Sequence, residues 1–223
     1  MAIEVLYEDE SLLFLNKPAD IVVQRGYDPD EPVLLDLATA HAGHLYLMQR
    51  LDRGTSGVMF FSKSADINAR LTRQFETKQI RKRYVALCEG ELGESQTIDA
   101  PLARIGPISF GVRGHGKRAI TAIAPLRPTI NGSLVSVVLQ TGRTHQIRVH
   151  LAAIGHPIVG DWLYGQRNAA RPMLHAAELG MIHPLTNEPL RVAAPVPDDF
   201  RAAAEERGIV SRSEDIMTAL ESS

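Results

Sequence analysis

Short apolar runs separated by turn residues are the feature that most limits how this chain can fold. Runs such as Leu12–Leu15 and Val58–Phe61 have the length of a strand, and charged residues, proline or glycine follow them closely. The predicted helices are fewer and do not alternate regularly with the predicted strands, as a doubly wound parallel sheet would require. The pattern therefore predicts an α+β fold with a mixed, mainly antiparallel sheet and flanking helices.

Most of the predicted elements are strands. The glycine-rich segment Ala103–Gly116 has no hydrophobic period and is predicted to be a long loop, and loops of that length are often functional. Helices are predicted where apolar residues recur at helical spacing behind a capping residue or proline. We expect strands near residues 3–7, 12–15, 21–23, 45–48, 57–62, 84–89, 119–124 and 133–140, and helices that start near Pro32, Ser64, Thr144 and Ser213.

Composition places the chain among ordinary globular proteins. Its 223 residues are 44% apolar and 22% charged, enough for one large domain or a pair of subdomains. We expect a main domain over residues 1–200 and an acidic tail or short helix over residues 201–223. No apolar run approaches the ~18–20 residues that cross a bilayer. The single cysteine, Cys88, excludes an internal disulfide framework, so we expect a cytoplasmic protein without a membrane segment.

Positive charge is concentrated in the middle of the chain, although the net charge is −2. Residues 50–148 contain 16 Lys/Arg and 7 Asp/Glu, whereas residues 198–223 contain 3 arginines and 7 acidic residues. Arginine outnumbers lysine 19 to 5, and its planar guanidinium suits phosphate oxygens and stacks on bases. The distribution is compatible with a nucleic-acid partner, but an ordinary globular surface explains it equally well.

The motifs of metal, nucleotide and serine-hydrolase chemistry are missing from the sequence. It contains no HExxH, CxxC, GK[ST] or GxSxG motif. His145 and His150 are five residues apart and so point to different faces of a helix. We therefore expect no metal and no cofactor.

The segment Leu47–Lys63 (LMQRLDRGTSGVMFFSK) places one carboxylate, Asp52, between two arginines. A glycine-containing bend and the apolar run Val58–Phe61 follow directly. Asp52 therefore stands at the end of buried structure, where a charge needs a partner. A surface aspartate in a turn is the alternative interpretation of the same residues.

Two further elements supply cationic and aromatic side chains. In GRTHQIR, Arg148 follows the core-facing Ile147 in a predicted helix, and a partly buried guanidinium there needs an anion, for which Asp52 is a candidate. Tyr84 follows the basic triplet Arg81–Arg83 at the start of a predicted strand. Basic groups beside an aromatic ring are typical of a site for an unstacked base.

The element QRLDRGTSG resembles the HRLDxxTSG element of the RluA-type RNA pseudouridine synthases. Three more elements resemble that family, in its order: NKPAD at residues 16–20, RQFETKQIRKRYVAL at residues 73–87, and TGRTHQIRVHLAAIGHPIVGDWLYG at residues 141–165. Together the elements extend over most of the chain, from about Val5 to Pro197. The resemblance implies a stand-alone catalytic domain without an S4-type RNA-binding module, with a central catalytic cleft and a stem-loop of ribosomal or transfer RNA as its substrate.

The resemblance also implies isomerisation of uridine to pseudouridine without a cofactor. By motif position, Asp52 would be the catalytic carboxylate, Tyr84 the aromatic that stacks on the uracil, and Arg148 the arginine that pairs with Asp52. The carboxylate could attack C1′ or take the C2′ proton, and the sequence leaves both routes open. The target base must leave its stack. Arg50 would fill the vacated space, bind a phosphate or form a structural salt bridge.

Further RNA contacts are expected from basic side chains in and around these motifs. The 103–116 segment would act as a clamp on the RNA or be no more than a variable surface loop, and we expect a monomer without a protein partner. The residues expected to contact phosphates are Lys17, Arg53, Arg73, Lys82, Lys117, Arg118 and Arg143.

Gln49 departs from the family pattern, which usually has histidine before Arg-Leu-Asp. Glutamine can donate and accept hydrogen bonds but cannot take a charge, so a structural role would survive the change. The departure leaves open an inactive RNA-binding or chaperone protein with the same fold. A glycosidase-like hydrolase that uses Asp52 is a further alternative, but it would need a second carboxylate ~5–10 Å away, and no sequence-local partner is evident.

Overall fold

The computed structural model describes residues 3–26, 31–211 and 215–221. The chain divides into two compact units, and each unit is built from two stretches of sequence. The first unit contains Met1–Lys82 and Ala176–Pro195, and the second contains Arg83–His175 and Val196–Ser223. In the described ranges, every helix is too short or too polar to span a bilayer.

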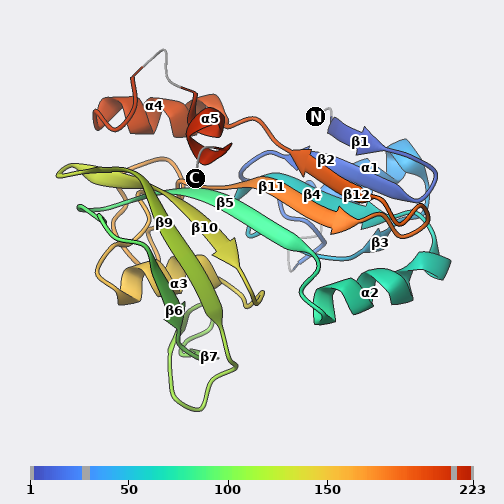
Figure 1. Ribbon diagram of the computed structural model, residues 1–223, viewed down its shortest axis with the longest axis horizontal. Helices are drawn as coiled ribbons and strands as arrows, with labels where there is room; N and C mark the ends of the chain where they lie inside the picture. Colours follow the sequence, from blue (N-terminus) through green and yellow to red (C-terminus); the bar gives the residue numbers. More distant parts are fainter. Residues whose placement is uncertain (1–2, 27–30, 212–214, 222–223) are drawn as a thin grey trace. The chain divides into compact units, whose positions relative to one another are not determined.

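The first unit is built on a sheet of short strands (Figure 1). The strand order is β1-β2-β4-β11, with β12 paired to β11 and β3 paired to β4. The β1–β2, β2–β4, β3–β4 and β11–β12 pairs are antiparallel. The elements are β1 (Glu4–Glu8), β2 (Leu12–Lys17), α1 (Leu34–Ala42), β3 (Tyr46–Leu47), β4 (Ser56–Ser62), η1 (Ala65–Ile67), α2 (Asn68–Glu76), β11 (Leu174–Ile182) and β12 (Pro189–Ala193).

The core of the first unit forms around β2 and β4, the two strands that the sequence presents as unbroken apolar runs. Nearly every residue of both strands is buried, as expected for strands covered on both faces. Phe60 of β4 stacks on Phe14 of β2 at 5.3 Å and on Phe75 of α2 at 6.2 Å between ring centroids. Ser64 accepts a hydrogen bond from the Asp66 amide at 3.2 Å, so the cap predicted at Ser64 is confirmed.

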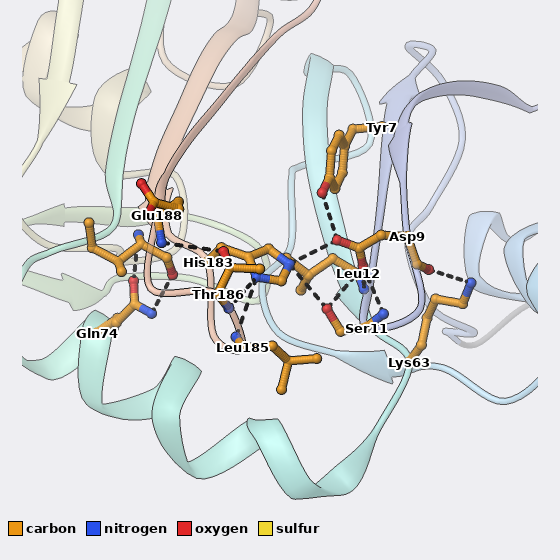
Figure 2. A network of polar contacts seen from close by, with 11 residues as sticks. Tyr7, Asp9, Ser11, Leu12, Lys63, Gln74, His183, Leu185, Thr186 and Glu188 are labelled. Atoms are coloured by element: carbon orange, nitrogen blue, oxygen red, sulfur yellow. Dashed lines mark hydrogen bonds and ion pairs between the residues drawn. The ribbon is translucent and has the colours of Figure 1, made fainter.

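Two side chains join turns of the first unit that are distant in sequence (Figure 2). Asp9, between β1 and β2, accepts hydrogen bonds from the Tyr7 hydroxyl (2.6 Å), the Ser11 amide (2.7 Å), the Leu12 amide (2.8 Å) and His183 Nε2 (2.8 Å). Burial acts to raise the pKa of Asp9, but the hydrogen bonds from Tyr7, Ser11 and Leu12 outweigh it and hold the pKa well below its ordinary value. Asp9 and His183 therefore fasten the β1–β2 turn to the turn that follows β11.

The second unit is built on the antiparallel order β5-β10-β9-β6, and the pair β7–β8 forms a separate two-stranded sheet (Figure 1). The α+β class and the mainly antiparallel sheet that the sequence predicts are thereby confirmed. Its elements are β5 (Arg81–Cys88), β6 (Gln96–Asp99), β7 (Leu102–Arg104), β8 (Phe110–Val112), β9 (Ile120–Thr129), β10 (Gly132–Leu139), α3 (Gln146–Ala153), α4 (Asp198–Glu206) and α5 (Ile216–Glu221).

The segment predicted to be a long loop, Ala103–Gly116, contains a hairpin instead. Residues of β7 and β8 pair in register, with Leu102 opposite Val112, and the Ile105 amide donates to the Ser109 carbonyl at 3.0 Å. The prediction was wrong because glycine and proline residues interrupt the alternation of side chains by which such short strands are recognised in a sequence. A residue outside the hairpin also holds it in place, since the Phe110 amide donates a hydrogen bond to the Tyr164 hydroxyl at 2.9 Å.

Several predicted boundaries differ from the structure. Thr144 is not the cap of α3, because His145 precedes the helix with φ 56° and makes no capping bond. Strand β9 continues past Ala124 through two prolines, which is tolerated because β6 begins opposite Ile123 and pairs only with Ile120–Ile123 of β9. The boundary predicted at residue 200 falls inside α4, where Phe200 is fully buried. The cap predicted at Ser213 lies outside the described residues.

Candidate active site

Asp52 begins a tight turn between β3 and β4. Its carbonyl accepts a hydrogen bond from the Thr55 amide at 3.0 Å, and its side chain is half-buried. Leu51 (8% exposed), Thr55 and Ser56 (3% each) are buried beside it, whereas Arg50 and Arg53 are exposed. The structure therefore places Asp52 at the edge of the core, as the sequence predicts, and not on a freely exposed turn.

The backbone of this turn is fastened by the NKPAD segment. The Arg53 carbonyl accepts hydrogen bonds from the Asp20 amide at 2.9 Å and from Lys17 Nζ at 3.0 Å. Lys17 Nζ also donates to the Pro18 carbonyl at 2.8 Å, and the side chain is fully buried. The phosphate contact predicted for Lys17 is therefore corrected: its ammonium binds backbone carbonyls inside the first unit.

Gly57 brings the strand after the turn against its neighbour. Its φ of 114° is strained for a residue with a side chain, and a Cβ there would lie 2.2 Å from the Ala176 carbonyl oxygen. Only glycine allows β4 to approach β11 this closely. Gly57, the second residue of β4, thus fixes the position of the strand that follows the Asp52 turn.

Arg148 lies in α3 of the second unit and is 7% exposed. Its Nε donates to Asp161 Oδ2 at 2.7 Å and its Nη2 donates to Oδ1 at 2.8 Å. Asp161 has no exposed surface and also accepts from the Leu163 amide at 3.1 Å. Sequence reasoning missed Asp161, although a carboxylate within the apolar stretch IVGDWL was a signal that it needs a buried cation. The pairing of Arg148 with Asp52 stays a prediction.

Tyr164 connects Arg148 to the hairpin. The guanidinium carbon of Arg148 lies 5.1 Å from the Tyr164 ring centroid, within the range of a cation–π contact. The Tyr164 hydroxyl accepts from the Phe110 amide at 2.9 Å and lies 2.8 Å from His145 Nδ1. These contacts hold helix α3, the hairpin and the turn after Asp161 together in one polar network.

The remaining polar residues of THQIRVH have structural partners. Gln146 Oε1 accepts from the Thr141 hydroxyl at 2.8 Å and the Arg143 amide at 3.0 Å, and Nε2 donates to the Ile120 carbonyl and the Thr121 hydroxyl oxygen, both at 2.9 Å. All four groups lie in the second unit. Gln146 therefore fixes the loop that leads into α3.

His150 is a buried neutral side chain in the same network. Its Nε2 must donate to the Ala100 carbonyl at 2.9 Å, so Nδ1 accepts from the Thr121 hydroxyl at 2.8 Å. Burial lowers the pKa of His150 and so favours the neutral ring. In the described ranges, no group of three or more His, Cys, Asp and Glu side chains could hold a metal ion.

Tyr84 lies in β5, opposite Val137 of β10, and is 6% exposed. Lys82, two residues earlier, is partly buried, and burial lowers the pKa of its ammonium, which lies 5.4 Å from the Phe75 ring centroid. The other basic residues expected to contact RNA are exposed: Arg50, Arg53, Arg73, Lys117, Arg118 and Arg143.

Some of these exposed cations already contact protein groups. Arg53 forms an ion pair with Glu31 at 2.5 Å, and Arg118 forms one with Asp99 at 2.8 Å. Arg143 Nε donates to the Arg118 carbonyl at 3.1 Å, so these two residues lie together on the second unit. Both members of the Arg118–Asp99 pair are exposed, and such pairs contribute little to stability.

Gln49, three residues before Asp52, has a buried side-chain amide. Its Nε2 finds no hydrogen-bond partner within the part of the chain that the structure describes. A buried donor without a partner is unusual in a folded protein. The structure gives no physical account of this departure from the histidine pattern.

Comparison with known proteins connects this arrangement to one family. A family model described as RNA pseudouridylate synthase matches residues 11–153. The ribosomal large subunit pseudouridine synthase D of Zymomonas mobilis is 35% identical to this chain over 89% of the chain and 71% of that protein. The protein of the same name from Haemophilus influenzae is 32% identical, over 89% of this chain and 68% of that protein.

Solved structures show the same fold. The human RNA pseudouridylate synthase domain containing 4 protein superposes with a TM-score of 0.77 at 23% identity, covering 93% of this chain and 94% of the human one. The human RNA pseudouridylate synthase domain containing 1 protein gives the same TM-score at 25% identity, covering 99% and 95%.

Proposed function

This chain belongs to the RNA pseudouridylate synthase family, and we propose that its substrate is a uridine in structured large-subunit ribosomal RNA. It is an isomerase that converts uridine in RNA to pseudouridine. The observation that carries the proposed target is the name shared by relatives from several bacteria, which match about nine-tenths of this chain. A ribosomal substrate would place the enzyme in the cytoplasm, where it would act as a monomer.

We propose Asp52 as the catalytic carboxylate. The N1–C1′ bond of uridine breaks, the uracil rotates, and C5 bonds to C1′; C5 then loses its proton and N1 gains one, so that the product is an isomer. Positive charge develops at C1′, and Asp52 would either attack that carbon or take the C2′ proton. The fastened turn supports this role, because Lys17 and Asp20 hold the Arg53 carbonyl next to Asp52.

Tyr84 and Arg148 are proposed to complete the site by their positions in the family motifs. Tyr84 would stack on the extruded uracil and assist removal of the C5 proton. Arg148 would pair with Asp52 and fix its rotamer. Its fork with Asp161 supports a positioning role, since it restricts the guanidinium to one orientation.

The exposed arginines and Lys117, together with the partly buried Lys82, would bind the RNA backbone. Arg50, adjacent to the Asp52 turn, would fill the space that the target base leaves or bind a flanking phosphate. Lys17 is excluded from this set because it is buried. The proposed phosphate ligands are Arg53, Arg73, Lys82, Lys117, Arg118 and Arg143.

Mapping pseudouridines in a strain that lacks the gene tests the target. We expect one or a few large-subunit sites to revert to uridine and to be restored by the wild-type gene but not by Asp52→Ala. Loss of sites only in transfer RNA would contradict the ribosomal target. An unchanged pseudouridine map would favour an inactive RNA-binding protein instead.

A further inference from the structure

Trp162 is the only tryptophan in the chain, and 56% of its surface is exposed. It makes no hydrogen bond and no ring contact with any residue that the structure describes. A single exposed apolar residue is ordinary on a protein surface. Trp162 differs because the segment that carries it is fixed on both sides and is joined to Arg148.

The 160–168 loop is closed at its base. The Gly160 amide donates to Asn168 Oδ1 at 2.9 Å, and the Gly165 amide donates to the Asp161 carbonyl at 2.8 Å. Gly160 has φ 78°, and a Cβ there would lie 2.1 Å from the Arg171 carbonyl oxygen. The loop backbone is therefore packed tightly within the second unit, and the Trp162 side chain that it carries is exposed to solvent.

The loop is also joined to the proposed catalytic machinery. Oδ1 of Asp161 accepts from the Leu163 and Tyr164 amides at 3.1 and 3.3 Å, while the same carboxylate binds the Arg148 guanidinium. Trp162 thus lies in the turn between Asp161 and Tyr164. Asp161 binds the Arg148 guanidinium, and the Tyr164 ring contacts it. A base that stacks on Trp162 would be positioned relative to Arg148 by this turn.

The charge of the loop suits a nucleotide. Arg167 is exposed and forms no ion pair with the described residues. An exposed indole and a guanidinium on one short loop can bind a base by stacking and its phosphate by charge.

We propose that Trp162 is a stacking platform for an unpaired RNA base that flanks the target uridine, with Arg167 binding an adjacent phosphate. The inference rests on the proposed function and adds to it a second point of RNA recognition, separate from the uracil pocket. Stacking on an aromatic side chain is tolerant of base identity. Trp162 would therefore contribute affinity and orientation more than sequence choice.

Tryptophan fluorescence gives a direct readout, because Trp162 is the only indole. An unmodified transcript of large-subunit ribosomal RNA is titrated into the Asp52→Ala variant, so that no turnover occurs, while filter retention measures the bound fraction independently. We expect the fluorescence to be quenched in proportion to the bound fraction. A matched control is the double variant Trp162→Phe, Ile130→Trp: residue 130 is 80% exposed at the β9–β10 turn, and its indole should not be quenched.

The RNA affinity of Trp162 variants distinguishes base stacking from a purely structural role of this side chain. We expect Trp162→Ala to weaken RNA binding about tenfold, which corresponds to ~1.4 kcal/mol, with the thermal midpoint unchanged. Trp162→Phe should recover most of the affinity, and Ile130→Ala should have none of the effect. RNA that binds without quenching, or binds Trp162→Ala as tightly as the parent, would overturn the inference and leave the proposed function intact. Absence of both RNA binding and isomerase activity in the wild type would overturn the proposed function itself.

Discussion

The guanidinium of Arg148 is held by the carboxylate of Asp161 through two parallel hydrogen bonds of 2.7 and 2.8 Å. Both residues are almost fully removed from solvent. A buried pair of this geometry fixes orientation, and removal of one member leaves the other charge without compensation. Asp161 therefore determines the direction in which the proposed catalytic arginine can act.

Replacement of Asp161 tests this relationship. We expect Asp161→Asn to lower the free energy of unfolding by about 3 kcal/mol and to lower kcat, because Arg148 loses its anionic support. Urea unfolding and steady-state kinetics measure the two effects. Asp199→Asn is the matched control, since Asp199 pairs with the buried Arg171 at 2.6 and 2.9 Å. That variant should be less stable but should keep its kcat, and an equal loss of kcat in both would contradict a specific role for Asp161.

Replacement of Lys17 separates a structural lysine from a phosphate ligand. Lys17→Met removes the two hydrogen bonds to the Pro18 and Arg53 carbonyls. We expect stability to fall by about 1–3 kcal/mol and kcat to fall, because the Asp52 turn loosens. RNA affinity and its salt dependence should not change. In contrast, Arg73→Gln should reduce the slope of log K against log salt by roughly 1. A reduced salt slope in Lys17→Met would contradict the buried position.

Acid should destabilise the first unit through Asp9. The folded pKa of this carboxyl is held below its ordinary value, so its ionised form stabilises the fold above the unfolded pKa of about 4. That stability is lost as the pH falls from about 4 toward the lower folded pKa. Denaturant midpoints measured across this range should decline more steeply in the wild type than in Asp9→Asn. Parallel curves would show that the contacts in Figure 2 do not favour the ionised carboxylate.

Gly57 should be intolerant of any side chain. A Cβ would collide with the Ala176 carbonyl at a positive φ, so Gly57→Ala should cost about 3 kcal/mol or more of stability. Gly26→Ala in the same unit is the control, because nothing lies within 4 Å of a Cβ there. Its stability should change by no more than about 1 kcal/mol. Thermal unfolding of the pair measures the difference, and equal midpoints would contradict the close approach of β4 and β11.

The sequence predicted the elements whose information is local. The apolar runs of β2 and β4 and the capping hydroxyl of Ser64 are visible within a few residues, and the structure confirms them. The β7–β8 hairpin was not predictable in this way. Its strands are only three residues long, and a contact between Phe110 and Tyr164, 54 positions apart, helps to fix it.

The roles of the candidate site residues stay predictions, and the contacts that hold Arg148 were not predictable from the sequence. The resemblance to the family motifs suggested Asp52, Tyr84 and Arg148, whereas the ion pair of Arg148 with Asp161 depends on how α3 packs against the following turn. Lys17 was misassigned for a related reason. A lysine after an apolar strand looks like a surface cation in sequence, and only the fold shows that the chain turns back over it to present two carbonyls.

Tritium release from RNA labelled at uracil C5 tests the central claim most directly, since the C5 proton is lost only when the new C5–C1′ bond forms. The substrate is large-subunit ribosomal RNA from a strain that lacks the gene. We expect the wild-type enzyme to release tritium and Asp52→Asn to release none, while both bind the RNA with similar affinity. Release by Asp52→Asn at the wild-type rate would contradict the assignment of Asp52 as the catalytic carboxylate.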